Sequence, residues 1–182
     1  MRIKSPLLLW PALLFVLSAC TGLPRDPVVD AMTWPTLGGR LIENNGFQHQ
    51  IYYKDSNQTL TFQAATWVSR NDIRFIVFNN IGQKITEINA VENNLVMQPR
   101  RHTMRNLHLS SIFALVQFVF TPDYAETLAD LRVESKPGAK SIWRDNELIL
   151  EIQDKNAERP GTDVLMIHHQ LHFEARLQTT AL

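Results

Sequence analysis

The chain has 182 residues, with 18 basic and 18 acidic side chains, so its formal net charge is zero. This balance excludes the broad basic surface by which proteins bind nucleic acids without sequence preference. The length suits one domain with a hydrophobic core of its own, and the single cysteine excludes an internal disulfide.

The first twenty residues have the pattern of a secretory signal that ends in a lipid attachment site. Arg2 and Lys4 form a short basic region, and the apolar segment 7–17 that follows is too short for a permanent membrane-spanning helix. The next residues, Ser18 and Ala19, are small and precede Cys20, the only cysteine. The pattern resembles the lipobox of bacterial lipoproteins, which implies cleavage before the cysteine and its modification by lipid, including palmitate. The alternative is a signal peptide with an incidental cysteine.

A lipid on Cys20 predicts a protein that is anchored to a membrane. Removal of residues 1–19 leaves 163 residues with a formal charge of −2, and two or more acyl chains are enough for stable attachment. In well-studied lipoproteins an aspartate after the cysteine commonly retains the protein in the inner membrane. Thr21 stands there instead, so this resemblance implies the outer membrane, on its periplasmic side.

Residues 20–39 contain three prolines and three glycines, which favours a lipidated N-terminus and tether rather than a packed element. A short helical turn at 28–33 is compatible with this composition. We expect the remaining residues, 40–182, to form the single folded domain.

Short apolar runs between polar turn signals predict five strands in the first half of that domain. They cover residues 47–54, 59–69, 73–78, 84–91 and 95–98. In the second of these strands, Leu60, Phe62, Ala64 and Val68 share one face, and Thr66 interrupts it. This two-residue period is typical of a half-buried strand, and the close spacing of the strands predicts an antiparallel meander.

The pattern changes between residues 107 and 131, where apolar residues crowd together without strand turns. We expect a helix here with Ser110 as its cap, and a second short helix that begins at Pro122. Strands then resume at 141–144, 148–153, 164–169 and 171–178. The nine strands predict a mainly β fold: a strongly curved antiparallel sheet, or incomplete β-barrel, whose concave face is covered by the helical insert.

Residues 52 to 177 carry a family resemblance, through the Gly82 turn and the strand after it, the apolar helix 109–120 and the hairpin 149–172. With the lipidated N-terminus, these features resemble the DUF3261 family of Gram-negative lipoproteins. The resemblance implies a fold like that of the lipoprotein carriers LolA and LolB, an incomplete barrel closed by helices over a hydrophobic cavity. Members often lie near genes for aryl polyene lipids. No catalytic residues come with the family.

A cavity for acyl or polyene chains needs large apolar walls. The residues that could line it are Phe62, Trp67, Phe75, Phe78, Met97, Ile112, Phe113, Leu115, Val116, Phe118, Val119, Trp143 and Met166. The same residues would fill a closed core equally well. Arg100, Arg101 and Arg105 precede the apolar helix and are candidates to hold a lipid head group at the mouth of the cavity, or they form a solvated loop.

A metal site or an enzyme is the less favoured interpretation. His168 and His172 would share a strand face, but positions four apart on a strand are about 13 Å apart, too far for one zinc ion. No serine lies in a Gly-x-Ser-x-Gly elbow, and no pair of carboxylates stands out as acid and base. We therefore expect no catalysis, no metal and no cofactor, and a polar sheet face or hydrogen-bonding lining at the histidines.

The sequence predicts a non-enzymatic outer-membrane lipoprotein that binds a hydrophobic ligand during its delivery to the membrane. The ligand would be a lipid, an acylated protein or an aryl-polyene-type lipid. The alternative is a structural or assembly accessory lipoprotein with a filled core, which binds a protein partner. An open apolar cavity between the sheet and the helix at Ile112 would favour the first function, and continuous packing there would favour the second.

Overall fold

The computed structural model describes residues 26–31, 45–69, 72–91, 94–98, 107–120, 130–159 and 161–182. These residues form one sheet of ten strands and two helices. In chain order the elements are α1 (Pro27–Ala31), β1 (Asn45–Asp55), β2 (Thr59–Val68), β3 (Asp72–Phe78), β4 (Lys84–Val91), β5 (Asn94–Met97), α2 (Leu109–Phe120), β6 (Arg132–Lys136), β7 (Ala139–Arg144), β8 (Glu147–Asp154), β9 (Asp163–His168) and β10 (Phe173–Ala181).

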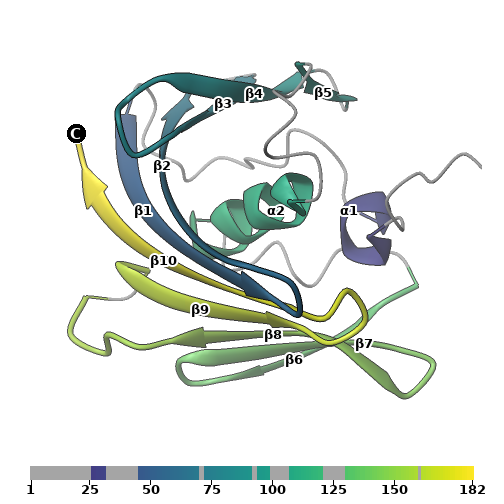
Figure 1. Cartoon of the computed structure of the whole chain (residues 1–182). Helices are drawn as coiled ribbons and strands as arrows, with labels where there is room; N and C mark the ends of the chain where they lie inside the picture. The colour runs from purple at the N-terminus through teal and green to yellow at the C-terminus, as the bar shows by residue number, and fades with distance from the viewer. Residues whose placement is uncertain are drawn as a thin grey trace, which may run out of the picture.

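The sheet is built from two meanders that meet at their first and last strands. The strand order is β5-β4-β3-β2-β1-β10-β9-β8-β7-β6, and β1 pairs with β10 in antiparallel register from Phe47–Ala181 to Asp55–Phe173. Two register shifts, one between β3 and β4 and one between β7 and β8, mark irregularities of the kind that bend strands. The sheet curls around α2 (Figure 1), which confirms the mainly β, strongly curved architecture expected from the sequence.

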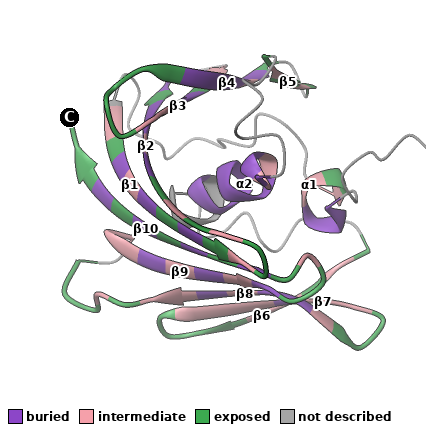
Figure 2. Ribbon diagram, in the orientation of Figure 1, coloured by how far each residue is buried: buried purple, intermediate pink, exposed green. Residues whose placement is uncertain are grey.

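Alternation along the strands separates an apolar concave face from a polar convex face (Figure 2). In β10, Phe173, Ala175 and Leu177 are buried, whereas the residues between them are exposed. Because paired residues of neighbouring strands share a face, the same alternation extends across β9 and β1. The hydrophobic core therefore lies between the concave face and α2.

All nine expected strands are present, with bounds that differ by at most three residues. One strand was missed: β6 is short, charged at three of its five positions and has no buried residue, so it lacks the apolar alternation that marks a strand. The strand expected to begin at residue 171 begins at Phe173, because His169–His172 form a turn, in which His172 has a φ of 53°. The helix expected at Pro122 lies outside the described residues.

The first helix belongs to the packed body of the molecule, although its residues lie in the segment expected to be a tether. Asp26 caps α1, since its Oδ1 accepts a hydrogen bond of 2.8 Å from the backbone N–H of Val28. Val28 is buried in the core, and α1 packs against α2. The signal segment, Cys20 and the other tether residues lie outside the described part of the chain.

Candidate functional site

The helix α2 lies within the concave face of the sheet, which we call the trough (Figure 1). Residues 111–116 of this helix are all at most 2% exposed. Six consecutive residues make more than one and a half turns, so the helix is enclosed on every side at this level. Buried residues of α2 are mostly apolar, which gives the trough an apolar occupant from its own chain.

Contacts between α2 and the trough floor are close. The rings of Phe113 in α2 and Phe75 in β3 have centroids 5.5 Å apart, and Phe62 and Met166 on the floor are completely buried. A side chain beside a cavity wide enough for water would keep some accessible surface. The side chains of residues 111–116 and of the floor residues named above keep almost none, so this part of the helix fills the trough around it.

The structure places most of the predicted lining residues together. Phe62, Phe75, Ile112, Phe113, Leu115, Val116 and Met166 are buried between sheet and helix, and Met97 packs against them while partly buried. Trp143 is partly buried but faces away from the trough, because it alternates with the inward Ile142 and pairs with the exposed Arg132, whose guanidinium lies 5.3 Å from the centroid of its ring. The structure does not describe the side chains of Phe118 and Val119, nor the residues Arg100, Arg101 and Arg105.

Two further predicted lining residues do not face the trough. Trp67 is 41% exposed and lies on the convex face, because it alternates with Thr66 and Val68, which are buried. Phe78 is paired with Gln63, which alternates with the inward Phe62 and Ala64, so Phe78 also lies on the convex side. Both predictions are corrected by the two-residue period of a strand.

A buried histidine crosses the middle of the trough floor. His49 in β1 is fully buried, with its Nδ1 3.0 Å from the hydroxyl of Thr179 in β10 and its Nε2 2.8 Å from the hydroxyl of Thr66 in β2. Burial lowers the pKa of His49 to about 4, so the ring is neutral at neutral pH. This group, which we call the His49 bridge, explains the interruption at Thr66. The role of His49 could not be predicted from the sequence, because the bridge depends on the pairing of three strands.

A second buried polar group lies where α1 meets the trough. Nε2 of His168, at the end of β9, lies 3.2 Å from Oδ1 of Asp26, and the backbone N–H of Leu171 donates to Nδ1 of the same ring. Because Nδ1 accepts this hydrogen bond, the ring proton lies on Nε2, which contacts the carboxylate without the geometry of a hydrogen bond. Burial alone would raise the pKa of Asp26, but interactions with His168, Ser111 and the N–H of Val28 together lower it.

This group, which we call the Asp26 joint, connects α1 and β9 through Asp26 and His168. Ser111 of α2 is close enough to lower the pKa of Asp26, but its hydroxyl has no hydrogen-bond partner among the described residues. The order of these three residues differs from that of a hydrolytic triad, in which the histidine lies between the serine and the carboxylate. Here the carboxylate lies between the other two. The arrangement therefore does not have the order of a Ser-His-Asp triad, and its shown contact joins α1 to β9.

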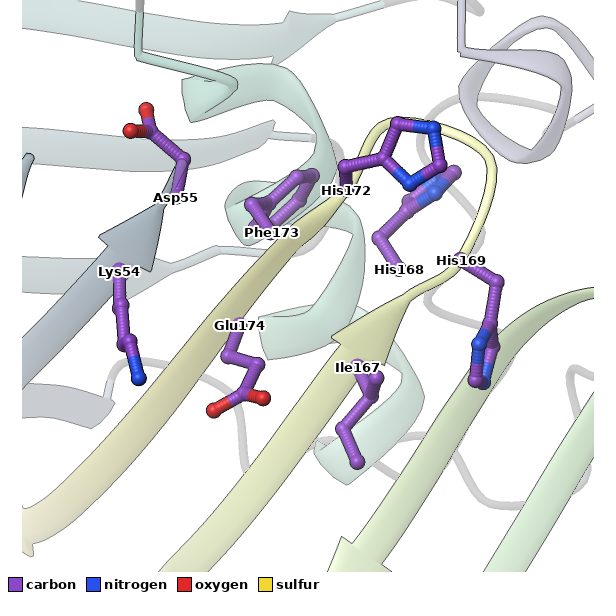
Figure 3. A pocket seen from close by; sticks show the side chains of 8 residues that line it. All are labelled: Lys54, Asp55, Ile167, His168, His169, His172, Phe173 and Glu174. Carbon is purple, nitrogen blue, oxygen red and sulfur yellow. The ribbon is translucent and has the colours of Figure 1, made fainter. Parts of the chain in front are cut away.

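A pocket of about 250 Å³ opens beside the joint (Figure 3). It is lined by Lys54, Asp55, Ile167, His168, His169, His172, Phe173 and Glu174. Phe173 stacks with three rings, those of Tyr53, His108 and His168, at centroid distances of 4.9 to 5.4 Å. His169 points away from this stack and lies 2.9 Å from Glu151. Within the described ranges, no three histidine, cysteine or acidic side chains gather closely enough to hold a metal ion.

Neither described helix has the length and hydropathy to cross a bilayer. Known proteins resemble most of the chain. The sequence model of DUF3261, a family of proteins of unknown function, matches residues 46–181. No curated protein gives a significant match. Among solved structures, a LolA superfamily protein from Nitrosomonas europaea is similar, with 11% sequence identity, a TM-score of 0.46, and coverage of 85% of this chain and 89% of that chain.

Proposed function

The chain belongs to the DUF3261 family, and from this premise we propose that it is a membrane-anchored, non-catalytic protein that binds a hydrophobic ligand in its trough in exchange for α2. The ligand would be a lipid, an acylated protein or an aryl-polyene-type lipid on its way to the membrane. One observation carries the proposal: an apolar helix is enclosed by a sheet that would keep its own backbone pairing without that helix.

The chemistry of the contact between α2 and the trough favours exchange. Hydrophobic contacts are non-directional and depend on buried area, so an acyl or polyene chain can replace apolar side chains without matching their geometry. A helix with its side chains is about 10 Å across, which is room for more than one hydrocarbon chain. The strands retain their ladder hydrogen bonds when the helix moves, because these bonds join strand to strand.

The anchor in this proposal is lipid on Cys20, after cleavage of residues 1–19. The basic and apolar segments before it and the small residues beside it support this assignment. Thr21 in place of aspartate supports the periplasmic side of the outer membrane as the location. Partners are then the membrane itself and a ligand that is carried to it, with no nucleic acid involved.

A second function has an observation in its favour. Buried residues of the trough and of α2 have almost no accessible surface, which is the packing expected of a permanent core and the continuous packing that was expected to favour this second function. In that case the protein is a structural or assembly accessory lipoprotein, and α2 never leaves the trough. Its partner would be a protein that binds its outer surface.

Ligand exchange and a permanent core predict opposite results when a probe is added. We suggest native mass spectrometry and hydrogen–deuterium exchange of the Cys20→Ala chain with cis-parinaric acid, a polyene fatty acid. Exchange predicts a mass adduct and faster deuterium uptake in residues 109–120, with the strands unchanged. No adduct and no change in uptake would eliminate the exchange mechanism and leave the accessory function.

A pair of variants separates exchange from binding in an ordinary pocket. Phe113→Ala removes a contact that holds α2 in the trough, so the form without ligand is less stable and the affinity for the fatty acid rises, by roughly tenfold for 1.4 kcal/mol. An ordinary pocket lined by Phe113 would lose affinity instead. Trp67→Ala, on the convex face, is the matched control and should leave the affinity unchanged.

A further inference from the structure

The two ends of the trough differ in what lies at their rims. The helix α1, the β1–β2 turn and the β9–β10 turn all lie toward one end, which we call the α1 end (Figure 1). The loop between β8 and β9 and the C-terminus lie at the opposite end (Figure 1). The Asp26 joint ties α1 to its end, since Asp26 contacts His168 immediately before the β9–β10 turn.

Chain length limits how far the α1 end can be from the membrane. Asp26 follows Cys20 by six residues, and six residues span roughly 20 Å at full extension. The strand β10, with nine residues, runs roughly 30 Å from the α1 end toward the opposite end. An anchor on Cys20 therefore reaches the bilayer most easily when the α1 end faces it and the opposite end points away.

The surface at the α1 end suits lipid head groups rather than hydrocarbon. Its exposed residues include Ser56, Asn57, His169, Gln170 and His172, all of them polar. None of the large hydrophobic side chains exposed in the described part of the molecule belongs to these two turns. Polar side chains of this kind can remain hydrated at the membrane surface and hydrogen-bond to phosphate and glycerol oxygens.

The pocket beside the joint adds donors for an anion at the same end. Lys54 carries an ammonium group, and the exposed ring of His172 offers a further N–H. Both side chains line the pocket: Lys54 comes from the end of β1, and His172 comes from the β9–β10 turn (Figure 3). Glu174 in the same lining would accept from an amine, so a head group with phosphate and ammonium can use both kinds of group.

We propose that the α1 end rests on the bilayer and that the pocket lined by Lys54 and His172 binds the phosphate of a phospholipid head group. This inference rests on the lipid anchor in the proposed function, and it adds where the trough stands relative to the membrane. Ligand then enters or leaves beside α1, at the end of the trough nearest to the lipid.

Depth-dependent quenching tests the orientation. Cysteines are introduced singly at Gln170, in the β9–β10 turn, and at Ala157, in the β8–β9 loop, both exposed positions. Acylation blocks Cys20, so each new cysteine takes a fluorophore selectively. The lipidated proteins are placed in vesicles of phosphatidylethanolamine and phosphatidylglycerol that contain head-group spin labels. We expect strong quenching at residue 170 and little at 157; equal or reversed quenching overturns the orientation.

A longer tether provides a second measurement of the orientation. Ten Gly and Ser residues inserted after Thr21 remove the length limit, so the difference in quenching between residues 170 and 157 should shrink. Mass spectrometry of the purified protein establishes the acyl chains first. Absence of acylation overturns both the anchor and this inference, whereas an acylated protein with reversed quenching overturns this inference alone and leaves ligand binding in the trough untouched.

Vesicle binding by the soluble Cys20→Ala chain tests the pocket. The double variant Lys54→Gln, His172→Gln should bind the same vesicles severalfold more weakly, while Lys155→Gln, in the β8–β9 loop, should bind like the parent. Glycerol 3-phosphate serves as the soluble competitor. Unchanged binding by the double variant overturns the head-group site, as does a parent chain that binds glycerol 3-phosphate but not vesicles, which would indicate a free phosphate ester.

Discussion

The middle of the trough and its α1 end each bury a histidine, but the two are held in different ways. In the middle, the His49 bridge joins hydroxyl groups on β2 and β10, the two strands that pair with β1 on either side. At the α1 end, His168 lies against a carboxylate that belongs to a separate helix. One contact lies within the sheet, and the other connects the sheet to a segment outside it.

This difference indicates different roles for the two regions. Three strands share the His49 bridge, so its loss should weaken the sheet as a whole. The Asp26 joint holds a helix of five residues, so its loss should free α1 and leave the sheet folded. Local opening of this kind costs less than global unfolding.

The largest expected effect is that of His49→Ala. The variant leaves a cavity in the core and leaves the hydroxyls of Thr66 and Thr179 without this partner, so we expect a loss of about 3 to 4 kcal/mol in the free energy of unfolding. Urea denaturation of the Cys20→Ala chain measures it. Thr66→Val, which removes one of the two hydrogen bonds, should cost about 1 to 2 kcal/mol. Equal stability of His49→Ala and its parent would contradict the bridge.

Acid should weaken the same region by a similar amount. The pKa of His49 is about 4 in the folded protein against 6.5 as its ordinary value, so the unfolded chain binds the proton more tightly. The neutral ring makes its full contribution to the free energy of unfolding above pH 6.5. This contribution decreases by about 3 kcal/mol in total as the pH is lowered to about 4. Urea midpoints at pH 7 and pH 4.5 test this. In the variant His49→Gln, the free energy of unfolding should no longer show the decrease between pH 6.5 and 4.5 that His49 causes.

A smaller and more local effect is expected for Asp26→Asn. The asparagine keeps an oxygen to cap α1, but it removes the charge that faces His168. We expect about 1 to 2 kcal/mol, with faster deuterium exchange in residues 26–31 and unchanged exchange in the strands. Because the pKa of Asp26 is lowered in the fold, its contribution is present above its ordinary pKa and is lost as the pH falls below it. Faster exchange throughout the sheet would remove the distinction between the two regions.

The smallest effect belongs to the exposed histidine at the α1 end. His169→Gln breaks the contact with Glu151, but both side chains are partly exposed, and pairs of this kind contribute about 0.5 kcal/mol or less. Thermal or urea unfolding should therefore barely change. A loss comparable to that of Asp26→Asn would indicate that the β9–β10 turn, rather than the buried joint, holds this end together.

Sequence analysis found the strands because alternation is a local property, and β4 was even predicted with its observed bounds. The same alternation puts Trp67 and Phe62 on different faces of one strand. Trp67 should therefore not have been predicted to line the cavity together with Phe62. The His49 bridge and the Asp26 joint were not predictable in this way. Each depends on contacts between residues far apart in sequence, such as Thr179 with His49 and His168 with Asp26.

The ladder between β1 and β10 has a consequence for how the chain assembles. All the remaining ladders of the described sheet join strands that are consecutive in the sequence. Both meanders can therefore form early from local hairpins, whereas β1 must wait for a strand from the far end of the chain. The trough exists only after β10 docks, so a polypeptide lacking its final segment would expose two unpaired strand edges, β1 and β9, and could enclose nothing.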